Sequence, residues 1–392
     1  MDDVRQLVRI LYFTRSYTPH DHRFLNTLSQ TGHQVFYLPL EEAGSTMEDR
    51  PLPPGIEQIP WHGAGTRFRW RDSLRLAASL RPILRRIKPD LIHAGPLQNA
   101  AFVAALSGFQ PLVSMSWGSD LLIDADRSIW MRIATRYTLK HTRILLGDCR
   151  AVRDKAVQQF AFPPEQVVLF PWGIDLEQFS PRPAHDPSPR LPGRRDADIR
   201  RRLGWEDAFV LLSLRSWEPI YGVDVILRAF THAVRQIPEL RLLLLGDGSL
   251  APKIRSYITQ EGLSDYISIE GRVSYPNLPS YYHAADLYLS ASHSDGSSVS
   301  LMEALGCGVP CAVSDIPGNC EWIEPGVQGW LFPDGDDSAL AEAIGRAWQE
   351  QHQLETMRRA ARALAEERAD WRKNFPKLLE AYQTAVRRKP SA

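Results

Sequence analysis

The sequence contains little of what marks several special protein classes, beginning with cysteine. Only four of its 392 residues are cysteines, and none lies in a C-x-x-C pair: Cys149, Cys307, Cys311 and Cys320. So few cysteines exclude a disulfide-rich scaffold and disfavour a zinc site, so we expect reduced thiols in packed surroundings. Net charge is lacking too, because Lys plus Arg and Asp plus Glu both number 46. A neutral chain has no overall attraction to nucleic acid, and we predict no such partner.

Long apolar runs and a basic leader are absent as well. No window approaches the ~18 consecutive apolar residues that a membrane-spanning helix needs. The first residues, MDDVRQLVRILYF, begin with acids and reach only a short apolar stretch, unlike a signal peptide. We therefore expect a cytoplasmic protein. With 44% apolar and 23% charged residues the composition is globular, and the length suggests two or three domains of roughly 150 residues.

What the sequence does contain is a repeated alternation of strand-like and helix-like segments. In the first half, short apolar runs predict strands at residues 8–13, 34–38, 91–93, 112–116, 144–146 and 167–170. A loop at 17–23 is expected to precede a helix that ends at Gly32, and a helical pattern covers 72–87. The second half predicts a helix at 223–236 and strands at 209–214, 240–245, 266–269, 287–290 and 310–313. Such alternation predicts an α/β fold built on parallel sheets.

Proline separates the two halves. Residues 180–195, SPRPAHDPSPRLPGRR, hold five prolines in sixteen residues and cannot form a helix or a central strand. We therefore predict an N-terminal Rossmann-like domain at 1–180, a linker at 181–195 and a second Rossmann-like domain at 196–369. The C-terminal segment 370–392 has a helical apolar stripe and is expected to pack back on the first domain. Two such domains would face each other across a cleft, where the carboxyl ends of the strands place ligands.

The densest chemical signal lies at residues 290–318. A strand ends near 290, a small polar loop follows, and a helix is expected to begin at 298 or 299. The start of that helix would present free amides to an anion, and Gly296 would let backbone approach it closely. Alternatively, Ser297 and Ser298 only cap the helix. Asp295 and Glu303, on either side of the amides, suit hydroxyl recognition, which favours a nucleotide sugar as the ligand.

The same segment, SASHSDGSSVSLMEALGCGVPCAVSDIPG, resembles the donor-binding signature of the retaining GT-B glycosyltransferases, glycosyltransferase family 4 (group 1). That family carries two glutamates separated by seven residues, a helix of small residues and Gly-x-Pro. Other segments match the family in order: PWGIDLEQF at 171–179, LGDG at 245–248, EGRV at 270–273 and LPSYYHAAD at 278–286. The resemblance implies a GT-B fold and transfer of a sugar, with retention of anomeric configuration, from a UDP- or GDP-sugar to an unidentified hydroxyl acceptor. It implies neither a cofactor nor a metal.

The resemblance also implies roles for the matching residues. Glu303 would hold the ribose hydroxyls, Asp295 would contact the donor sugar, and Arg215 would bind the diphosphate; these three form the predicted catalytic group. The backbone of the loop and helix start would contact the sugar and diphosphate, and that of residues 272–273 the base. The other predicted donor-binding residues are Tyr221, Gly246, Arg272, Val273, Gly296, Ser297, Ser298, Val299 and Ser300.

Two positions depart from the family pattern. Asp295 is one methylene shorter than the usual glutamate, and Tyr221 stands where a lysine usually precedes the glycine. That lysine would neutralise the leaving diphosphate, so Arg215 or Lys253 would have to supply the charge. These departures leave open a catalytically inactive protein of the same fold that binds nucleotide sugars or acts as a scaffold. A dehydrogenase is disfavoured, because no G-x-G-x-x-G follows the first strand.

The first domain is expected to receive the acceptor. His20, Asp21 and His22 lie in the predicted loop at 17–23, where they would position or deprotonate a hydroxyl. A metal site and a solvated loop that fixes the helix start are the alternatives. Trp117 and Asp120 follow another strand, within WGSD. Asp120 would bind a hydroxyl, and Trp117 would either stack on a sugar or pack in the core.

A basic stretch runs from Arg67 to Lys88. It contains eight basic residues and one acid, and four apolar residues share one helical face: Leu76, Leu80, Ile83 and Ile87. One interpretation is a helix that covers the sheet and keeps a solvated basic rim. The other is peripheral docking on an anionic membrane.

Overall fold

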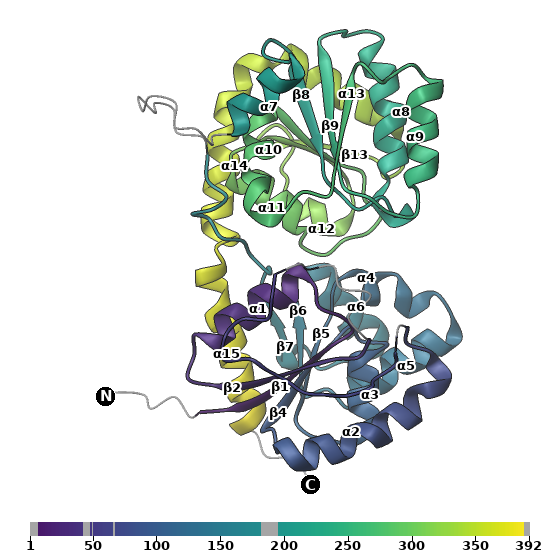
Figure 1. Ribbon diagram of the computed structural model, residues 1–392, viewed down its shortest axis with the longest axis vertical. Coiled ribbons are helices and arrows are strands. Elements are labelled where there is room, and N and C mark those ends of the chain that lie inside the picture. Colours follow the sequence, from purple (N-terminus) through teal and green to yellow (C-terminus); the bar gives the residue numbers. More distant parts are fainter. Residues whose placement is uncertain (1–6, 42–47, 49, 66, 182–194, 388–392) are drawn as a thin grey trace. The chain divides into compact units, whose positions relative to one another are not determined.

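The structure, a computed structural model, describes residues 7–41, 48, 50–65, 67–181 and 195–387 (Figure 1). Contacts divide the chain into two compact units: unit 1 comprises residues 1–170 and 375–392, and unit 2 comprises 171–374. Residues 171–180, expected in the first domain, thus group with unit 2, where the Ile174 N–H donates to the Ala369 carbonyl. Apart from its two end residues, the predicted linker lies outside the described residues.

Unit 1 is built on a seven-stranded sheet in which all neighbouring strands are parallel. The strands lie in the order β3-β2-β1-β4-β5-β6-β7. They are β1 (Arg9–Thr14), β2 (Gln34–Pro39), β3 (Glu57–Gln58), β4 (Leu91–Gly95), β5 (Leu112–Met115), β6 (Ile144–Gly147) and β7 (Val167–Leu169). The strands predicted from apolar runs are confirmed. The short edge strand β3 was missed because its two residues are polar and exposed.

Helices cover this sheet (Figure 1). They are α1 (Pro19–Ser29), α2 (Ser73–Ile87), α3 (Ala100–Ser107), α4 (Ser119–Leu122), α5 (Ile129–Lys140), α6 (Arg150–Phe160) and the C-terminal α15 (Trp371–Arg387). The predicted apolar face of α2 is buried in a core shared with α3, and the described basic residues of 67–88 are exposed. The apolar face of α2 is therefore buried in the core of unit 1.

α1 begins earlier than the sequence analysis predicted. Residues 17–23 were expected to form a loop, but the helix includes His20, Asp21 and His22. Thr18 is the N-cap: its hydroxyl accepts from the Asp21 N–H, and the Asp21 carboxylate accepts from the Thr18 N–H. Proline at the first helical position completes a start signal that was readable in the sequence as Thr-Pro-x-Asp.

Unit 2 contains a six-stranded parallel sheet in the order β10-β9-β8-β11-β12-β13. Its strands are β8 (Phe209–Ser213), β9 (Leu240–Leu245), β10 (Ile267–Gly271), β11 (Leu287–Ser290), β12 (Cys311–Ser314) and β13 (Gly329–Phe332). Its helices are α7 (Arg195–Leu203), α8 (Val223–Val234), α9 (Ala251–Gln260), α10 (Leu278–Ala284), α11 (Val299–Gly306), α12 (Pro317–Cys320), α13 (Asp337–Gln349) and α14 (Leu354–Arg368). Both units are therefore Rossmann-like, as predicted.

The C-terminal helix α15 contributes to both units. Its residues up to Asn374 group with unit 2, and those from Phe375 onward group with unit 1. In unit 1 the Tyr382 hydroxyl shares a hydrogen bond with Nδ1 of His93, a buried residue of β4. Helix α15 thus contributes to the core of unit 1.

The four cysteines differ in their exposure. Cys149, Cys307 and Cys311 are buried, but Cys320 is exposed at the end of α12, so packed surroundings were wrongly predicted for it. In the described ranges, no helix is long and apolar enough to cross a membrane. Nor do those ranges contain a group of three or more His, Cys, Asp or Glu side chains arranged to hold a metal ion.

Candidate functional site

The loop between β11 and α11 forms the first part of the candidate site. α11 begins at Val299, as predicted, and Ser298 is its N-cap residue. The Ser298 side chain makes no capping hydrogen bond; its hydroxyl instead accepts from the Arg215 guanidinium at 2.9 Å. The interpretation that Ser298 only caps the helix is therefore wrong. No side-chain cap occupies the first amides of α11, and such amides favour an anion.

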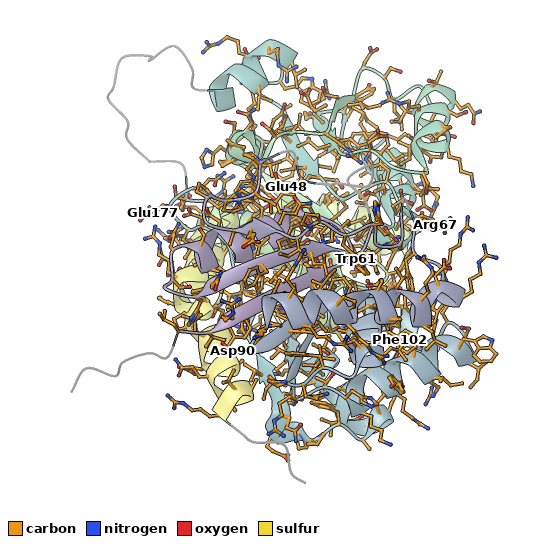
Figure 2. All side chains as sticks on the ribbon, turned by 60° about the horizontal axis from the view of Figure 1, so that its bottom comes forward. Glu48, Trp61, Arg67, Asp90, Phe102 and Glu177 are labelled. Atoms are coloured by element: carbon orange, nitrogen blue, oxygen red, sulfur yellow. The ribbon has the colours of Figure 1, made fainter. Side chains whose placement is uncertain are left out.

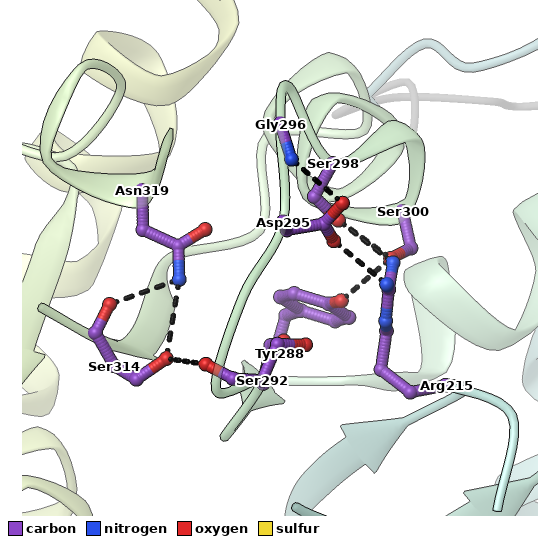
Figure 3. Close-up of polar contacts among 10 residues, drawn as sticks. Arg215, Tyr288, Ser292, Asp295, Gly296, Ser298, Ser300, Ser314 and Asn319 are labelled. Atoms are coloured by element: carbon purple, nitrogen blue, oxygen red, sulfur yellow. Dashed lines mark hydrogen bonds and ion pairs between the residues drawn. The ribbon is translucent and has the colours of Figure 1, made fainter. Parts of the chain in front are cut away.

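Arg215, which follows β8, joins the residues of this loop (Figure 3). Its Nη2 donates to Oδ2 of Asp295 at 2.7 Å, and its Nη1 donates to the hydroxyls of Ser298 and Ser300 at 2.9 and 3.0 Å. Tyr288 of β11 extends the network through a 2.8 Å hydrogen bond with the Ser300 hydroxyl. The structure thus brings Arg215 to Asp295, 80 residues later in the chain, and to the helix start that follows Asp295.

The guanidinium of Arg215 is a largely buried cation. Burial disfavours its charge, but Asp295 and the tyrosines Tyr221, Tyr288 and Tyr282 outweigh burial and raise its pKa above the usual value. The Tyr221 ring lies 4.2 Å from the guanidinium carbon, a cation–π contact at the position where the family has lysine. The Arg215 Nε–H is buried and has no hydrogen-bond partner among the described residues. A buried donor of this kind usually has a partner, which here points to a bound acceptor group.

Glu303 lies inside unit 2, on α11, with only 3% of its surface exposed. Its Oε2 accepts a 2.9 Å hydrogen bond from the Tyr282 hydroxyl, which also contacts the Ser300 carbonyl at 3.0 Å. Burial and the nearby Glu303 raise the pKa of Tyr282 well above its usual value, so this tyrosine is a permanent donor. Tyr282 was not singled out from sequence, because α10 and α11 meet only in the fold.

Glycine at two positions permits close packing around this loop. Gly246 has φ +105°, and a Cβ there would lie 2.7 Å from the Arg215 carbonyl oxygen. A Cβ on Gly318, at the start of α12, would lie 2.3 Å from the Gly296 carbonyl oxygen and 2.6 Å from that of Asp295. Gly318 therefore supports the loop from behind, a role that the sequence analysis did not assign.

A second polar chain fixes the other side of the loop (Figure 3). The Ser314 hydroxyl donates to the Ser292 carbonyl at 2.6 Å, and the Asn319 side chain donates to the Ser314 carbonyl at 2.9 Å. All three residues are buried, so their hydrogen bonds replace those with water. β12 and α12 thereby hold the position of the loop that carries Asp295 and Ser298.

Substitution of Gly318 by alanine is expected to displace this loop. The new methyl group would overlap two carbonyl groups, which typically costs about 1–3 kcal/mol of stability. Thermal unfolding of the variant should report this loss. Gly345 on α13 is the matched control, because a Cβ there meets nothing within 4 Å and alanine suits a helix better. A Gly318→Ala variant as stable as wild type would contradict the role assigned to this glycine.

The other predicted donor-side residues lie around the same edge of the sheet or inside it. The Gly246 N–H donates to the Gly271 carbonyl at 2.7 Å, which joins the ends of β9 and β10 next to Arg272 and Val273. Arg272 is exposed and Val273 packs partly on the core. The buried Ser297 hydroxyl accepts from the Trp322 indole at 3.4 Å. Lys253 is exposed on α9.

In unit 1, Asp21 is fully buried. Its carboxylate accepts hydrogen bonds from the Thr18 N–H and hydroxyl, at 2.9 and 2.6 Å, and from the Tyr12 hydroxyl at 3.1 Å. Burial raises the pKa of the carboxyl to about 7, although the hydrogen bonds from Thr18 and Tyr12 act to lower it. The predicted solvated loop is therefore wrong, and in the structure Asp21 bonds to the helix start and to β1.

The remaining acceptor-side residues gather near the ends of β4 and β5. His20 and Trp117 rings lie 5.0 Å apart, and the buried Trp117 Nε1 has no hydrogen-bond partner within the described part of the chain. Asp120 accepts from the Leu97 and Trp117 N–H groups, both at 2.9 Å, and from the Ser116 hydroxyl at 2.7 Å. Burial raises the Asp120 pKa to about 6. The Asp120 carboxylate thus stabilises the turn from Ser116 to Asp120.

The third predicted acceptor residue, His22, faces a different neighbour. Its Nδ1 shares a 2.7 Å hydrogen bond with the Tyr17 hydroxyl, and burial lowers its pKa. Tyr17 also lines a cavity of about 280 Å³, which was not predicted from the sequence. It is lined by Tyr17, Tyr37, Pro39, Leu40, Glu41, Arg50, Pro51, Leu52, Gln58, Trp61, His62 and Gly63. Tyr37, one of the lining residues, is buried.

The raised pKa of Asp21 predicts a pH dependence of stability. The folded protein holds a proton on this carboxyl up to about pH 7, whereas the unfolded chain releases it near 3.8. The native state therefore binds more protons between these values, and the free energy of unfolding falls as pH rises through that window, by at most ~4 kcal/mol. Asp21→Asn should flatten this slope in urea titrations at several pH values. An equal slope in variant and wild type would disprove the assignment.

Two family models match the sequence, one for each half of the chain. The model described as Glycosyl transferase 4-like matches residues 9–148, and the model described as Glycosyl transferases group 1 matches residues 195–364. The chain belongs to the group 1 glycosyltransferases. This confirms the resemblance found in residues 290–318.

Known relatives agree with this family assignment. The group 1 chain is 28% identical over 242 residues to D-inositol 3-phosphate glycosyltransferase of Thermobispora bispora, covering 59% of this chain and 54% of the relative. It is 24% identical over 297 residues to a GDP-mannose-dependent alpha-(1-6)-phosphatidylinositol monomannoside mannosyltransferase of Mycolicibacterium smegmatis, covering 73% and 74%. The chain spans about half the length of several curated relatives that it matches.

A solved structure gives the same fold. HepE of Anabaena, in complex with UDP-glucose, matches with a TM-score of 0.78 at 20% identity, covering 96% of this chain and 100% of HepE. The predicted GT-B fold, with two Rossmann-like domains, is thereby confirmed.

Proposed function

We propose that this group 1 chain is an active glycosyltransferase that moves a sugar from a nucleoside-diphosphate sugar to a hydroxyl acceptor, with retention of configuration. The observation that carries the proposal is the buried Arg215, whose Nε–H has no hydrogen-bond partner among the residues that the structure describes and which lies beside the helix start at Ser298. A buried cation next to uncapped amides suits the diphosphate of a leaving nucleotide. Asp295 and Glu303, on either side, would accept hydrogen bonds from sugar and ribose hydroxyls.

The donor would replace some of the present contacts. Asp295, now paired with Arg215, would exchange part of that ion pair for a donor hydroxyl. Gly246, Arg272 and Val273 lie where β9 and β10 end, which suits contact with the nucleotide base. Because Tyr221 stands where the family has a lysine, Arg215 would supply the positive charge that this lysine otherwise brings to the diphosphate.

The reaction would proceed on one face of the donor sugar. The bond between the anomeric carbon and the diphosphate oxygen breaks, the acceptor hydroxyl oxygen bonds to that carbon, and the acceptor proton passes to the departing phosphate oxygen. Negative charge grows on the leaving group, where Arg215 and the α11 amides are already oriented. We infer that Arg215 and the α11 amides neutralise the negative charge of the leaving diphosphate.

A panel of UDP-, GDP- and ADP-sugars, read by thermal shift, tests this proposal. We expect stabilisation by UDP- or GDP-sugars, because HepE was solved with UDP-glucose and the mycobacterial relative is named for GDP-mannose. Failure of every donor to stabilise the protein would overturn the proposal. Slow hydrolysis of the bound donor, followed by release of free sugar, would separate an enzyme from an inactive scaffold. Binding without any turnover, with or without candidate acceptors, would favour the scaffold.

The acceptor is proposed to bind unit 1. His20 and Trp117 lie together, and the cavity beside Tyr17 and Trp61 has aromatic walls with polar groups between them, as expected for a hydroxylated ring. We also infer a cytoplasmic protein that associates peripherally with anionic membrane through Arg67 to Lys88. In that segment, the exposed basic side chains rather than the buried apolar face of α2 would make the contact.

A further inference from the structure

Three hydroxyl groups lie in a row beside the Arg215 guanidinium (Figure 3). The Tyr288 hydroxyl is 2.8 Å from that of Ser300, which is 3.2 Å from that of Ser298. All three residues are buried, and their hydrogen bonds join β11 to the start of α11. We call these three side chains the hydroxyl row.

The Arg215 cation determines how the serine oxygens of this row are used. Charged side chains usually reach solvent, as Arg67 and Glu177 do (Figure 2), whereas only 12% of the Arg215 side chain is exposed. Its Nη1 donates to the Ser298 and Ser300 hydroxyls at 2.9 and 3.0 Å, and a guanidinium cannot accept a hydrogen bond. Each serine oxygen therefore uses one of its two lone pairs on the cation.

The remaining donors and acceptors allow two orders of protons along the hydroxyl row. A hydroxyl donates one hydrogen bond and accepts two. Since Ser300 already accepts from Arg215, it accepts from one of its two hydroxyl neighbours and donates to the other. In the first order Tyr288 donates to Ser300, and Ser300 donates to Ser298. In the second order both bonds run the opposite way.

An anion at the start of α11 favours the first order. In that order the Ser298 proton is the one that no hydroxyl of the row accepts, so it is free to donate to a ligand. In the second order Ser298 would present a lone pair, which repels an anion. Burial raises the pKa of Tyr288 to about 12, so the phenol keeps its proton and can act as the first donor of the row.

We propose that the Ser298 hydroxyl donates a hydrogen bond to the diphosphate of the bound nucleotide, and that Ser300 and Tyr288 hold it in this orientation. The inference rests on the proposed function for the identity of the ligand. It adds the Ser298 side chain to the diphosphate ligands, next to Arg215 and the α11 amides. Ser298 would touch the substrate directly, whereas Ser300 and Tyr288 are positioning residues that act through it.

Removal of the Ser298 hydroxyl tests the direct contact. Ser298→Ala should weaken the binding of UDP, or of GDP if wild type prefers it, by ~10-fold in isothermal titration, because a hydrogen bond to a charged group is lost. Ser298→Gly should show the same loss, and it keeps the helix start because glycine is well tolerated at an N-cap. Unfolding temperatures without nucleotide would show that both variants are folded. Binding as tight as that of wild type in both variants would overturn the contact.

A double-mutant cycle tests the positioning role. Tyr288→Phe should weaken nucleotide binding by ~3-fold or more in wild type and cause no further loss in Ser298→Ala, because Tyr288 acts only through the Ser298 hydroxyl. Equal losses in both backgrounds would show a merely structural effect and overturn the role. Tyr257→Phe is the matched control, because the Tyr257 hydroxyl also bonds to a hydroxyl, that of Thr231 at 3.1 Å, between α9 and α8. Its nucleotide binding should equal that of wild type.

The inference and the proposed function fail in different ways. If neither UDP nor GDP binds to wild type, the proposed function fails and the role of Ser298 fails with it. If one nucleotide binds but wild type and Ser298→Ala have the same dissociation constant, only the role of Ser298 is wrong. Donor binding through Arg215 and the α11 amides would then still stand.

Discussion

Substitution of Arg215 by alanine is expected to reduce glycosyl transfer by ~10³-fold or more. A single lost donor in a charge-stabilising site costs about 10²–10³-fold, and Arg215 also carries the only full positive charge in the network it forms with Asp295, Ser298 and Ser300. Binding of the free nucleoside diphosphate should weaken together with that of the donor. Isothermal titration with both ligands and single-turnover kinetics would measure the two effects.

Controls separate this role from a loss of folding. Arg215→Ala leaves Asp295 without its ion-pair partner, so some loss of stability is expected. Arg215→Lys keeps a charge but loses the planar fork, and it should retain intermediate activity. Arg228→Ala removes an arginine that pairs with Asp224 and Asp337 elsewhere in unit 2, and donor binding should be unchanged. If only the intact nucleotide sugar bound less tightly to Arg215→Ala, Arg215 would not be a phosphate ligand.

Substitution of Glu303 by alanine is expected to abolish the thermal shift caused by the donor. Two hydrogen bonds from the ribose hydroxyls to the buried Glu303 carboxylate would contribute about 3 kcal/mol or more. Their loss would raise the dissociation constant of the donor ~100-fold. The test compares donor with free nucleoside diphosphate, because both contain the ribose. An unchanged shift in the variant would count against the ribose role.

Tyr282 supplies the control for the Glu303 prediction. Glu303→Gln keeps an acceptor for the Tyr282 hydroxyl and preserves packing, so it should unfold at nearly the wild-type temperature while it binds donor less well. Tyr282→Phe removes the buried hydroxyl but keeps the carboxylate, and it should retain most donor binding. Were Tyr282→Phe as damaging as Glu303→Ala, the main role of Glu303 would be structural.

The sequence predicted the scaffold well because local patterns determine it. Buried parallel strands are continuous apolar runs, and each predicted run appears as a strand. The start of α11 at Val299 was also predicted, since a small polar loop precedes an apolar helix. The start of α1 was placed too late, although Thr18, Pro19 and Asp21 form a sequence pattern typical of a capped helix N-terminus.

Relations across the fold were not predictable from one sequence. The hydrogen bond from Tyr282 to Glu303 joins α10 to α11, and Gly318 supports a loop more than twenty residues before it in the chain. The pattern of α5 shows an amphipathic helix, but only its packing against α3 shows that Ile129 and Trp130 stay exposed. Likewise the apolar face of α2 looked available to lipid until its burial was known.

The discontinuity of unit 1 has a consequence for biosynthesis. The residues up to 170 are translated before unit 2, yet the segment from Phe375 onward, which supplies the Tyr382 hydroxyl to His93, is translated after it. The nascent N-terminal part therefore lacks a piece of its own interior while all of unit 2 is being made. Without the segment from Phe375 onward His93 would lose its hydrogen-bond partner Tyr382, so unit 1 cannot complete its core until unit 2 has been translated.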